Sequence, residues 1–214
     1  MKKIALVLAI LLVGTLFGCA AKEDSNTLYV LNWGDYIDEA LLTQFEEETG
    51  IQVNYTTMAT NEEMMVKLEE ADCIYDVCFP SDYIIERLIQ KDLLHELNKD
   101  NIPNLQYIDE RFLDLDFDPE NKYSVPYTWG TVGLIYNTKY ISEEDAQSWS
   151  CLWNSKYAGK LLMFDNPRDA FAIAESMLGY SYNTEDEQEL KNCADLLATQ
   201  SPVLQGYVMD QIFD

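Results

Sequence analysis

The stretch Leu28-Tyr29-Val30-Leu31-Asn32-Trp33-Gly34-Asp35-Tyr36 decides the fold, because an apolar run ends here in a polar, aromatic turn. Residues 28–32 have the length and composition of a buried strand. Apolar residues then recur at three- and four-residue spacing up to Gly50, which predicts a helix that stops at this glycine. The stretch therefore predicts a strand followed by a covering helix, the first unit of an α/β sheet.

The same alternation continues along the first half of the chain. Residues 51–58 and 76–79 predict two further strands. Residues 61–70 predict a helix that Asn61 caps, and a third helix follows Ser81. Strands that alternate with helices in this way predict a parallel sheet with helices on its faces.

The second half predicts a similar unit after a long polar loop over residues 93–123. The expected elements are a crossing strand at Val125–Asn137, a helix that Ser142 begins, a strand at Leu161–Phe164, a helix opened by Asn166-Pro167 with Phe171, Ala174, Met177 and Leu178 inward, a helix near 185–198 and a strand at 203–208. The loop contains Asp114, Asp116 and Asp118 at the first spacings of a calcium loop. Pro119 and Val125 occupy the positions that need glycine and glutamate, so we predict a solvated acidic turn.

The charge of the chain is strongly negative. Its 214 residues contain 14 Lys and Arg against 38 Asp and Glu, a formal net charge of −24. Binding to nucleic acid depends on Lys and Arg that neutralise phosphates, so this balance argues against a nucleic-acid partner. An acidic surface raises the local concentration of cations, although it also serves solubility alone.

The first residues have the organisation of a secretory signal. Lys2 and Lys3 precede an apolar run from Ile4 to Phe17, which is shorter than the roughly 20 residues of a spanning helix. Gly18-Cys19 then resembles the cleavage point of a bacterial lipoprotein. We expect residues 1–18 to be removed, Cys19 to carry a lipid anchor in the membrane, and residues 19–26 to form a tether. The alternative is an ordinary signal peptide with a chance cysteine.

Cysteine and histidine usage predicts no metal site and no cofactor. Four cysteines remain once Cys19 is assigned to lipid: Cys73, Cys78, Cys151 and Cys193. Three disulfide pairings are open to them outside the cytosol. Cys78 lies in an apolar run and is expected to be a small buried residue. The single histidine, His95, gives no zinc spacing, and the motifs of hydrolases, phosphate loops and dinucleotide binding are absent from the sequence.

Aromatic and polar residues follow several predicted strands. Ligands of parallel sheets bind beyond the carboxyl ends of the strands, where these residues are expected. Aromatic faces beside carboxylates suit an organic ammonium ion. The alternative for each residue is a core aromatic or a helix cap. The candidate ligand-binding residues are Trp33, Asp35, Tyr36, Ser81, Tyr83, Asp165, Asn166 and Asp169.

Several separated motifs, in the same order, resemble the spermidine/putrescine-binding proteins of bacterial ABC importers. They are Leu28–Ile37, Glu48-Thr49-Gly50-Ile51 with Val53, Tyr75-Asp76-Val77 with Pro80-Ser81-Asp82-Tyr83, Val125–Gly130 and Leu161–Asp169. The resemblance implies a two-lobe α/β fold of the type II periplasmic-binding-protein kind, incomplete at the C-terminus, with lobes over residues 27–127 and 128–214. It also implies a polyamine held between the lobes and delivery to the permease subunits of an ABC transporter.

The resemblance also implies roles for the candidate residues. Trp33 and Tyr36 would belong to an aromatic box, and Asp35 would receive an ammonium where the family more often has Glu. Ser81 and Tyr83 would line the lobe 1 side of the cleft, and Asn166 and Asp169 would contact the ligand from lobe 2. Asn166 departs from the family by placing an amide at a carboxylate position, which Asp165 could replace. The later ligand contacts of the family would lie beyond Asp214.

Other functions compete with this interpretation. The same fold could hold an amino acid or a sugar, and binding of a sugar would tolerate neutral replacement of Asp35 and Asp169. A sensory or adhesion lipoprotein is a further alternative. An enzyme ranks last, because the sequence offers no nucleophile with an adjacent base.

Overall fold

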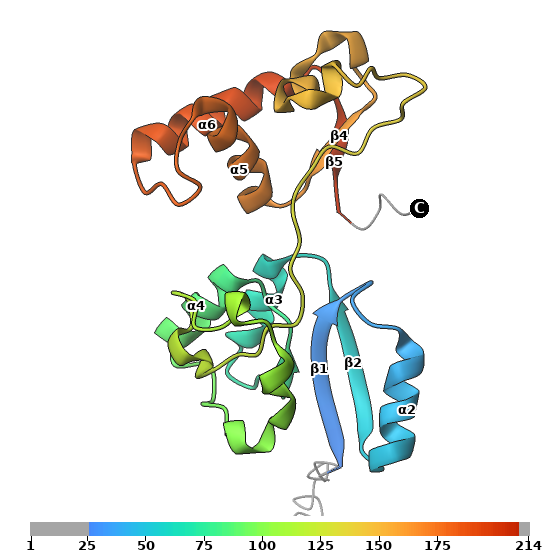
Figure 1. Ribbon diagram of the computed structural model, residues 1–214, viewed down its shortest axis with the longest axis vertical. Helices are drawn as coiled ribbons and strands as arrows, with labels where there is room; N and C mark the ends of the chain where they lie inside the picture. Colours follow the sequence, from blue (N-terminus) through green and yellow to red (C-terminus); the bar gives the residue numbers. More distant parts are fainter. Residues whose placement is uncertain (1–25, 210–214) are drawn as a thin grey trace, which may run out of the picture.

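The computed structural model describes residues 26–209, which form two lobes joined by an extended segment (Figure 1). Lobe 1 contains β1 (Thr27–Trp33), α2 (Glu39–Thr49), β2 (Gln52–Met58), α3 (Asn61–Leu68), β3 (Val77–Cys78) and α4 (Asp82–Gln90). Lobe 2 contains β4 (Leu161–Phe164), α5 (Pro167–Leu178), α6 (Glu187–Gln200) and β5 (Leu204–Val208). The predicted signal peptide and Cys19 lie outside the described residues. Within residues 26–209 no helix is both long and apolar enough to span a bilayer.

The sheet of lobe 1 is parallel, with the strand order β2-β1-β3. Val30 of the central strand lies opposite Tyr55 on one side and Val77 on the other. Because β1 is paired on both edges, Leu31 and Asn32 are completely buried. The predicted order of three strands and three helices is confirmed.

The helices of lobe 1 begin and end at polar or glycine residues. Gly50 has a left-handed backbone (φ 72°), and its N–H donates to the carbonyl of Glu46, which ends α2 as predicted. The predicted cap of α3 is wrong by one residue. Thr60 accepts the hydrogen bond from the N–H of Glu63, because Asn61 is already the first helical residue and points into the lobe.

One apolar cluster holds lobe 1 together. It comprises Leu31, Trp33, Met58, Met64, Met65, Leu68, Ile84 and Leu88, in agreement with the predicted buried faces of α3 and α4. Helix α2 differs, because it contains no buried residue and leaves Leu41 53% and Phe45 37% exposed. Its apolar face therefore lies uncovered among the described residues.

Lobe 2 is built on the parallel pair β4-β5, with α5 packed beside α6. The strands β4 and β5 and the helices α5 and α6 are confirmed, but the buried face of α5 agrees with the prediction only at Ala174. Ala170, Ile173 and Ala174 face the core, whereas Leu178 is 38% exposed. Phe171 and Met177 are only half-buried because the buried stripe lies one residue earlier around the helix.

Two expected elements between the lobes do not form. Residues 125–136 are extended but belong to no strand, because no strand among residues 26–209 pairs with them. The helix expected from Ser142 is reduced to a 3-10 turn, Asp145–Gln147. The carboxylate of Asp145 accepts a hydrogen bond from the Tyr157 hydroxyl at 2.5 Å and pairs with Lys156 at 3.0 Å.

The sequence predicts that the acidic turn is solvated, but this prediction is wrong for Asp118, which is buried. Its carboxylate accepts hydrogen bonds from the backbone N–H groups of Lys122, Tyr123 and Ser124 and from the Ser124 hydroxyl. Glu120 and Asn121 reverse the chain with positive φ angles of 62° and 48°. Asp118 therefore closes the turn from which the extended segment leaves lobe 1.

Candidate functional site

The carboxyl ends of β1 and β3 bring the first predicted site residues together. Trp33 is the last residue of β1, and its indole N–H donates to the carbonyl of Phe79 at 2.8 Å. Only 8% of Trp33 is exposed, so its ring is part of the core and lies behind the surface. Tyr36 lies in the following turn with its ring centre 5.8 Å from that of Trp33 and is 44% exposed. Asp35, beside it, is exposed.

Tyr127 extends this aromatic group and was not among the predicted site residues. Its hydroxyl donates to the backbone carbonyl of Tyr36, and the two rings lie stacked with centres 6.4 Å apart. The ring of Phe79 meets Tyr127 edge-on at 4.9 Å. Tyr127 belongs to the motif Val125–Gly130 that supports the family resemblance, and this motif was the available signal. We call Tyr36, Phe79 and Tyr127, backed by Trp33, the aromatic wall.

Asn61 fixes two other predicted residues from inside lobe 1. Its side-chain N–H₂ donates to the Ser81 hydroxyl at 2.9 Å and to the Tyr83 hydroxyl at 2.8 Å, while its oxygen accepts from the N–H of Ser81. Burial raises the pKa of Tyr83, and the hydrogen bond from Asn61 opposes this effect. The hydroxyl of Tyr83 therefore stays neutral and is held by Asn61.

The predicted residues of lobe 2 surround the start of α5. Asn166 caps this helix, and its side-chain oxygen accepts from the N–H groups of Arg168 at 2.9 Å and Asp169 at 3.5 Å. An oxygen occupied in this way is a weaker ligand for an ammonium ion. Asp165 is exposed, and Asp169 is half-buried with its pKa raised by desolvation. Of the two predicted carboxylates of lobe 2, Asp169 is therefore better shielded from water than Asp165.

The predicted residues of lobe 1 and those of lobe 2 come closest at Tyr83. The guanidinium of Arg168 lies 4.8 Å from the centre of the Tyr83 ring, which brings the start of α5 against lobe 1. Beyond burial, the negative charge of Asp169 also raises the pKa of Tyr83. Asp35 and Asp165, by contrast, are not joined to this contact by any described hydrogen bond or ion pair.

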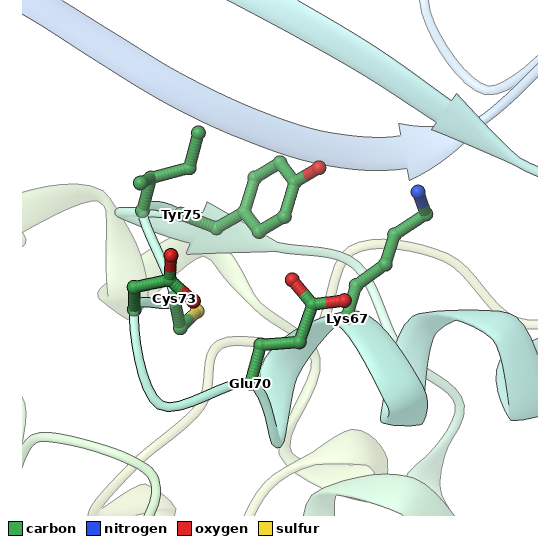
Figure 2. A pocket seen from close by; sticks show the side chains of 6 residues that line it. Lys67, Glu70, Cys73 and Tyr75 are labelled. Carbon is green, nitrogen blue, oxygen red and sulfur yellow. The ribbon is translucent and has the colours of Figure 1, made fainter.

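A separate hollow of about 210 Å³ lies between α3 and β3, at the opposite end of the lobe 1 sheet (Figure 2). Lys67 and Glu70 line one side, and Cys73 and Tyr75 come from the loop that leads into β3. It contains none of the predicted site residues. Since ligands of parallel sheets bind at the carboxyl ends of the strands, we place the site at Tyr83 and the aromatic wall.

Metal binding and disulfides receive no support from residues 26–209. Within this range, no group of His, Cys, Asp or Glu side chains is arranged to hold a metal ion. Cys73, Cys78, Cys151 and Cys193 are all free thiols. Cys78, which the sequence predicts to be a small buried residue, is only partly buried and packs against the core of lobe 1, where burial raises its pKa to about 11.

This geometry defines a binding protein with two α/β lobes. Residues 40–210 match the family described as bacterial extracellular solute-binding protein, and the chain belongs to this family. It is 36% identical over 192 residues to the spermidine/putrescine-binding periplasmic protein of Escherichia coli K12, covering 89% of this chain and 55% of that protein. The chain thus spans little more than half the length of this relative.

Solved structures of similar proteins support the same family assignment. A chain from a spermidine/putrescine ABC transporter of Listeria monocytogenes is 41% identical, with a TM-score of 0.85. The match covers 88% of this chain and 58% of the L. monocytogenes chain. The TpPotD lipoprotein of Treponema pallidum is 34% identical, with a TM-score of 0.80. The match covers 87% of this chain and 59% of the T. pallidum chain. The predicted fold and the predicted resemblance are therefore confirmed, and the family is one of solute-binding proteins rather than enzymes.

Proposed function

We propose that this protein binds a polyamine, spermidine or putrescine, between its two lobes and delivers it to the permease of an ABC transporter. The observation that carries the proposal is the approach of lobe 2 to the aromatic residues of lobe 1, with Arg168 on the ring of Tyr83 and the charge of the neighbouring Asp169 acting on the same tyrosine. The names of the E. coli and L. monocytogenes relatives, which include spermidine and putrescine, support the choice of ligand.

The chemistry of a polyamine fits these groups. Its methylene chain would lie along Tyr36 and Tyr127, which are 44% and 55% exposed. An ammonium ion over an aromatic face gains about 0.5–2 kcal/mol, and a charged hydrogen bond to a carboxylate adds about 1.5–3 kcal/mol. Asp169 would supply such a bond, and the pairing would offset the cost of its desolvation. Asp35 is the second proposed anchor, at the lobe 1 end of the site.

The mechanism is closure of the two lobes on the ligand about the extended segment 125–136. Asp118 anchors the lobe 1 end of this segment through Ser124, and Leu134 packs against the core of lobe 2 at the other end. The residues between these two anchors are mostly exposed. Tyr127 and Trp129 contact aromatic rings of lobe 1, so the changes of backbone angle that leave these contacts in place would fall in the exposed residues 130–133.

We also propose that the protein is extracytoplasmic and anchored through a lipid on Cys19 after removal of residues 1–18. The lipobox-like sequence supports this anchor, and the T. pallidum relative is itself named a lipoprotein. Metabolic labelling with a palmitate analogue tests it. The intact protein should incorporate the label, and Cys19→Ser should abolish incorporation; labelling that survives this substitution would contradict the proposal.

Calorimetric titration tests the ligand. Spermidine, putrescine and glutamate should be titrated into the purified protein, alone and in a form that continues with any coding sequence after Asp214. We expect binding of a polyamine and none of glutamate. Asp169→Asn should weaken binding by about 1.5–3 kcal/mol, roughly tenfold or more. Asp195→Asn is the matched control, because Asp195 pairs with Lys191 on the exposed side of α6. A folded protein that binds no polyamine in either form would direct the search to sugars and amino acids.

A further inference from the structure

We infer that Arg168 is a positioning residue that docks lobe 2 on lobe 1 through the ring of Tyr83, whether or not a ligand is bound. Its guanidinium lies 4.8 Å from the ring centre, and the two residues come from different lobes. The contact therefore sets where the neighbouring Asp169 lies relative to the aromatic wall.

The other cation–ring contacts of the described residues have a different origin. Each of them joins neighbours in the sequence, whose proximity the backbone imposes: Arg111 with Phe112, Lys122 with Tyr123, Lys139 with Tyr140, and Lys156 with Tyr157. Arg168 and Tyr83 are brought together only by the arrangement of the lobes. Their contact thus reports on the separation of the lobes.

The position of Arg168 is unfavourable for its own helix. It lies in the first turn of α5, where the helix dipole disfavours a positive charge. Among residues 26–209 no carboxylate lies within ion-pair distance of it, in a chain rich in Asp and Glu. The aromatic face of Tyr83 is the group that this charge contacts directly, while Arg168 also acts through its charge on the buried Glu175 of the same helix.

Tyr83 is held ready for this contact. Its hydroxyl accepts a hydrogen bond from Asn61, and its ring packs against the lobe 1 core. A ring fixed at both its edge and its back loses little freedom when a guanidinium stacks on it. Met209, which follows β5, also packs against the lobe 1 core, so the lobes meet at a second point.

The experiment measures lobe separation without ligand. Fluorophores on Glu47 of α2 and Lys191 of α6, both exposed, would report it by single-molecule energy transfer in the purified protein. Arg168→Gln should reduce the ratio of close to separated lobes by about two- to fivefold, the range for a solvent-accessible cation–π contact. Arg111→Gln is the matched control, because it removes a stacked guanidinium within lobe 1 alone.

A double-mutant cycle identifies the partner. Tyr83→Leu should reduce the same ratio, and Arg168→Gln should have no further effect in that background. Tyr83→Phe keeps the ring and should retain most of the contact, so the inference stays testable if the leucine variant unfolds. An unchanged ratio in Arg168→Gln, or equal effects of Arg168→Gln in both backgrounds, would overturn the inference.

The position of Asp169 in this inference rests on the proposed polyamine function, but the ligand-free measurement does not. If Arg168→Gln separates the lobes and no polyamine binds to the wild type, the docking role stands and the proposed function fails. If polyamine binds and Arg168→Gln changes neither lobe separation nor affinity, the docking role fails and the proposed function stands.

Discussion

Asp118→Ala is expected to destabilise lobe 1 strongly, because one buried carboxylate organises the turn that ends this lobe. Asp118 is 1% exposed and accepts from the N–H of Lys122 at 3.0 Å, of Tyr123 at 3.1 Å and of Ser124 at 2.8 Å. The Ser124 hydroxyl adds a bond of 2.6 Å. Alanine leaves all four donors without this acceptor.

The magnitude follows from these bonds. A hydrogen bond to a charged group contributes about 1.5–3 kcal/mol net, and bonds that share one acceptor are not additive. Water can reach part of the turn once the carboxylate is gone. We therefore expect Asp118→Ala to lower the free energy of unfolding by about 3–5 kcal/mol. Asp118→Asn keeps one acceptor oxygen and should lose about half of this.

Urea unfolding followed by tryptophan fluorescence measures the effect. Asp116→Ala is the matched control, since Asp116 is an exposed member of the same turn. It should change stability by no more than about 0.5 kcal/mol. A value for Asp118→Ala within this margin of the control would refute the argument that the buried carboxylate holds the turn.

Three further predictions concern the site and the thiols. Trp33→Ala should cost about 3–5 kcal/mol of stability because its ring is in the core, whereas Tyr127→Ala should mainly weaken polyamine binding; unfolding curves and calorimetry separate the two effects. Burial raises the pKa of Asp169 above 3.8, so polyamine affinity should fall as the pH falls through this raised pKa and the carboxylate becomes protonated. The contribution of Asp169 to folding stability has the opposite dependence, because the protonated form is favoured by burial and is lost as the pH rises through the same pKa. A pH profile of binding that Asp169→Asn leaves unaltered would contradict this prediction. Among the four described thiols, the exposed Cys73 should react first with a thiol reagent, and the buried Cys151 and Cys193 should stay protected until unfolding. Cys78 is partly buried and has its pKa raised by burial to about 11, so it should react more slowly than Cys73; mass spectrometry of the labelled peptides decides.

The sequence predicts the regular elements well where a local pattern determines them. The alternation along residues 51–58 and the glycine at position 50 are local signals, and the structure confirms β2 and the end of α2. The exposed face of α2 shows the limit of such patterns. Periodic apolar residues indicate a face that can be buried, but they do not indicate what covers it.

The missed features depend on contacts between distant residues. Tyr127 becomes part of the aromatic wall because its hydroxyl reaches the carbonyl of Tyr36, which no spacing in the sequence indicates. Asp118 appears in the sequence as one more charge in an acidic loop. Its burial requires the chain to reverse through Glu120 and Asn121 in left-handed conformations; Asn adopts this conformation more readily than most residues, but Glu does not, so the pair gives no clear signal.

Among the candidate ligand residues, too, some could be predicted from local sequence and others depend on contacts between distant residues. The predictions for Ser81, Tyr83 and Asp169 place them at the starts of α4 and α5, which the structure brings to one region. Asn61, which orients Ser81 and Tyr83, could not be identified because its sequence position is that of an ordinary helix cap. Their roles toward a ligand stay predictions for the titrations above.

The extended segment 125–136 also acts as a tether that sets the local concentration of one lobe around the other. A short linker of this kind holds its two ends at an effective concentration on the order of millimolar. A single cation–ring contact would be negligible between separate molecules, yet it becomes an intramolecular equilibrium here. The length of this segment, and not only the chemistry of the facing surfaces, therefore determines how often the lobes meet before any solute arrives.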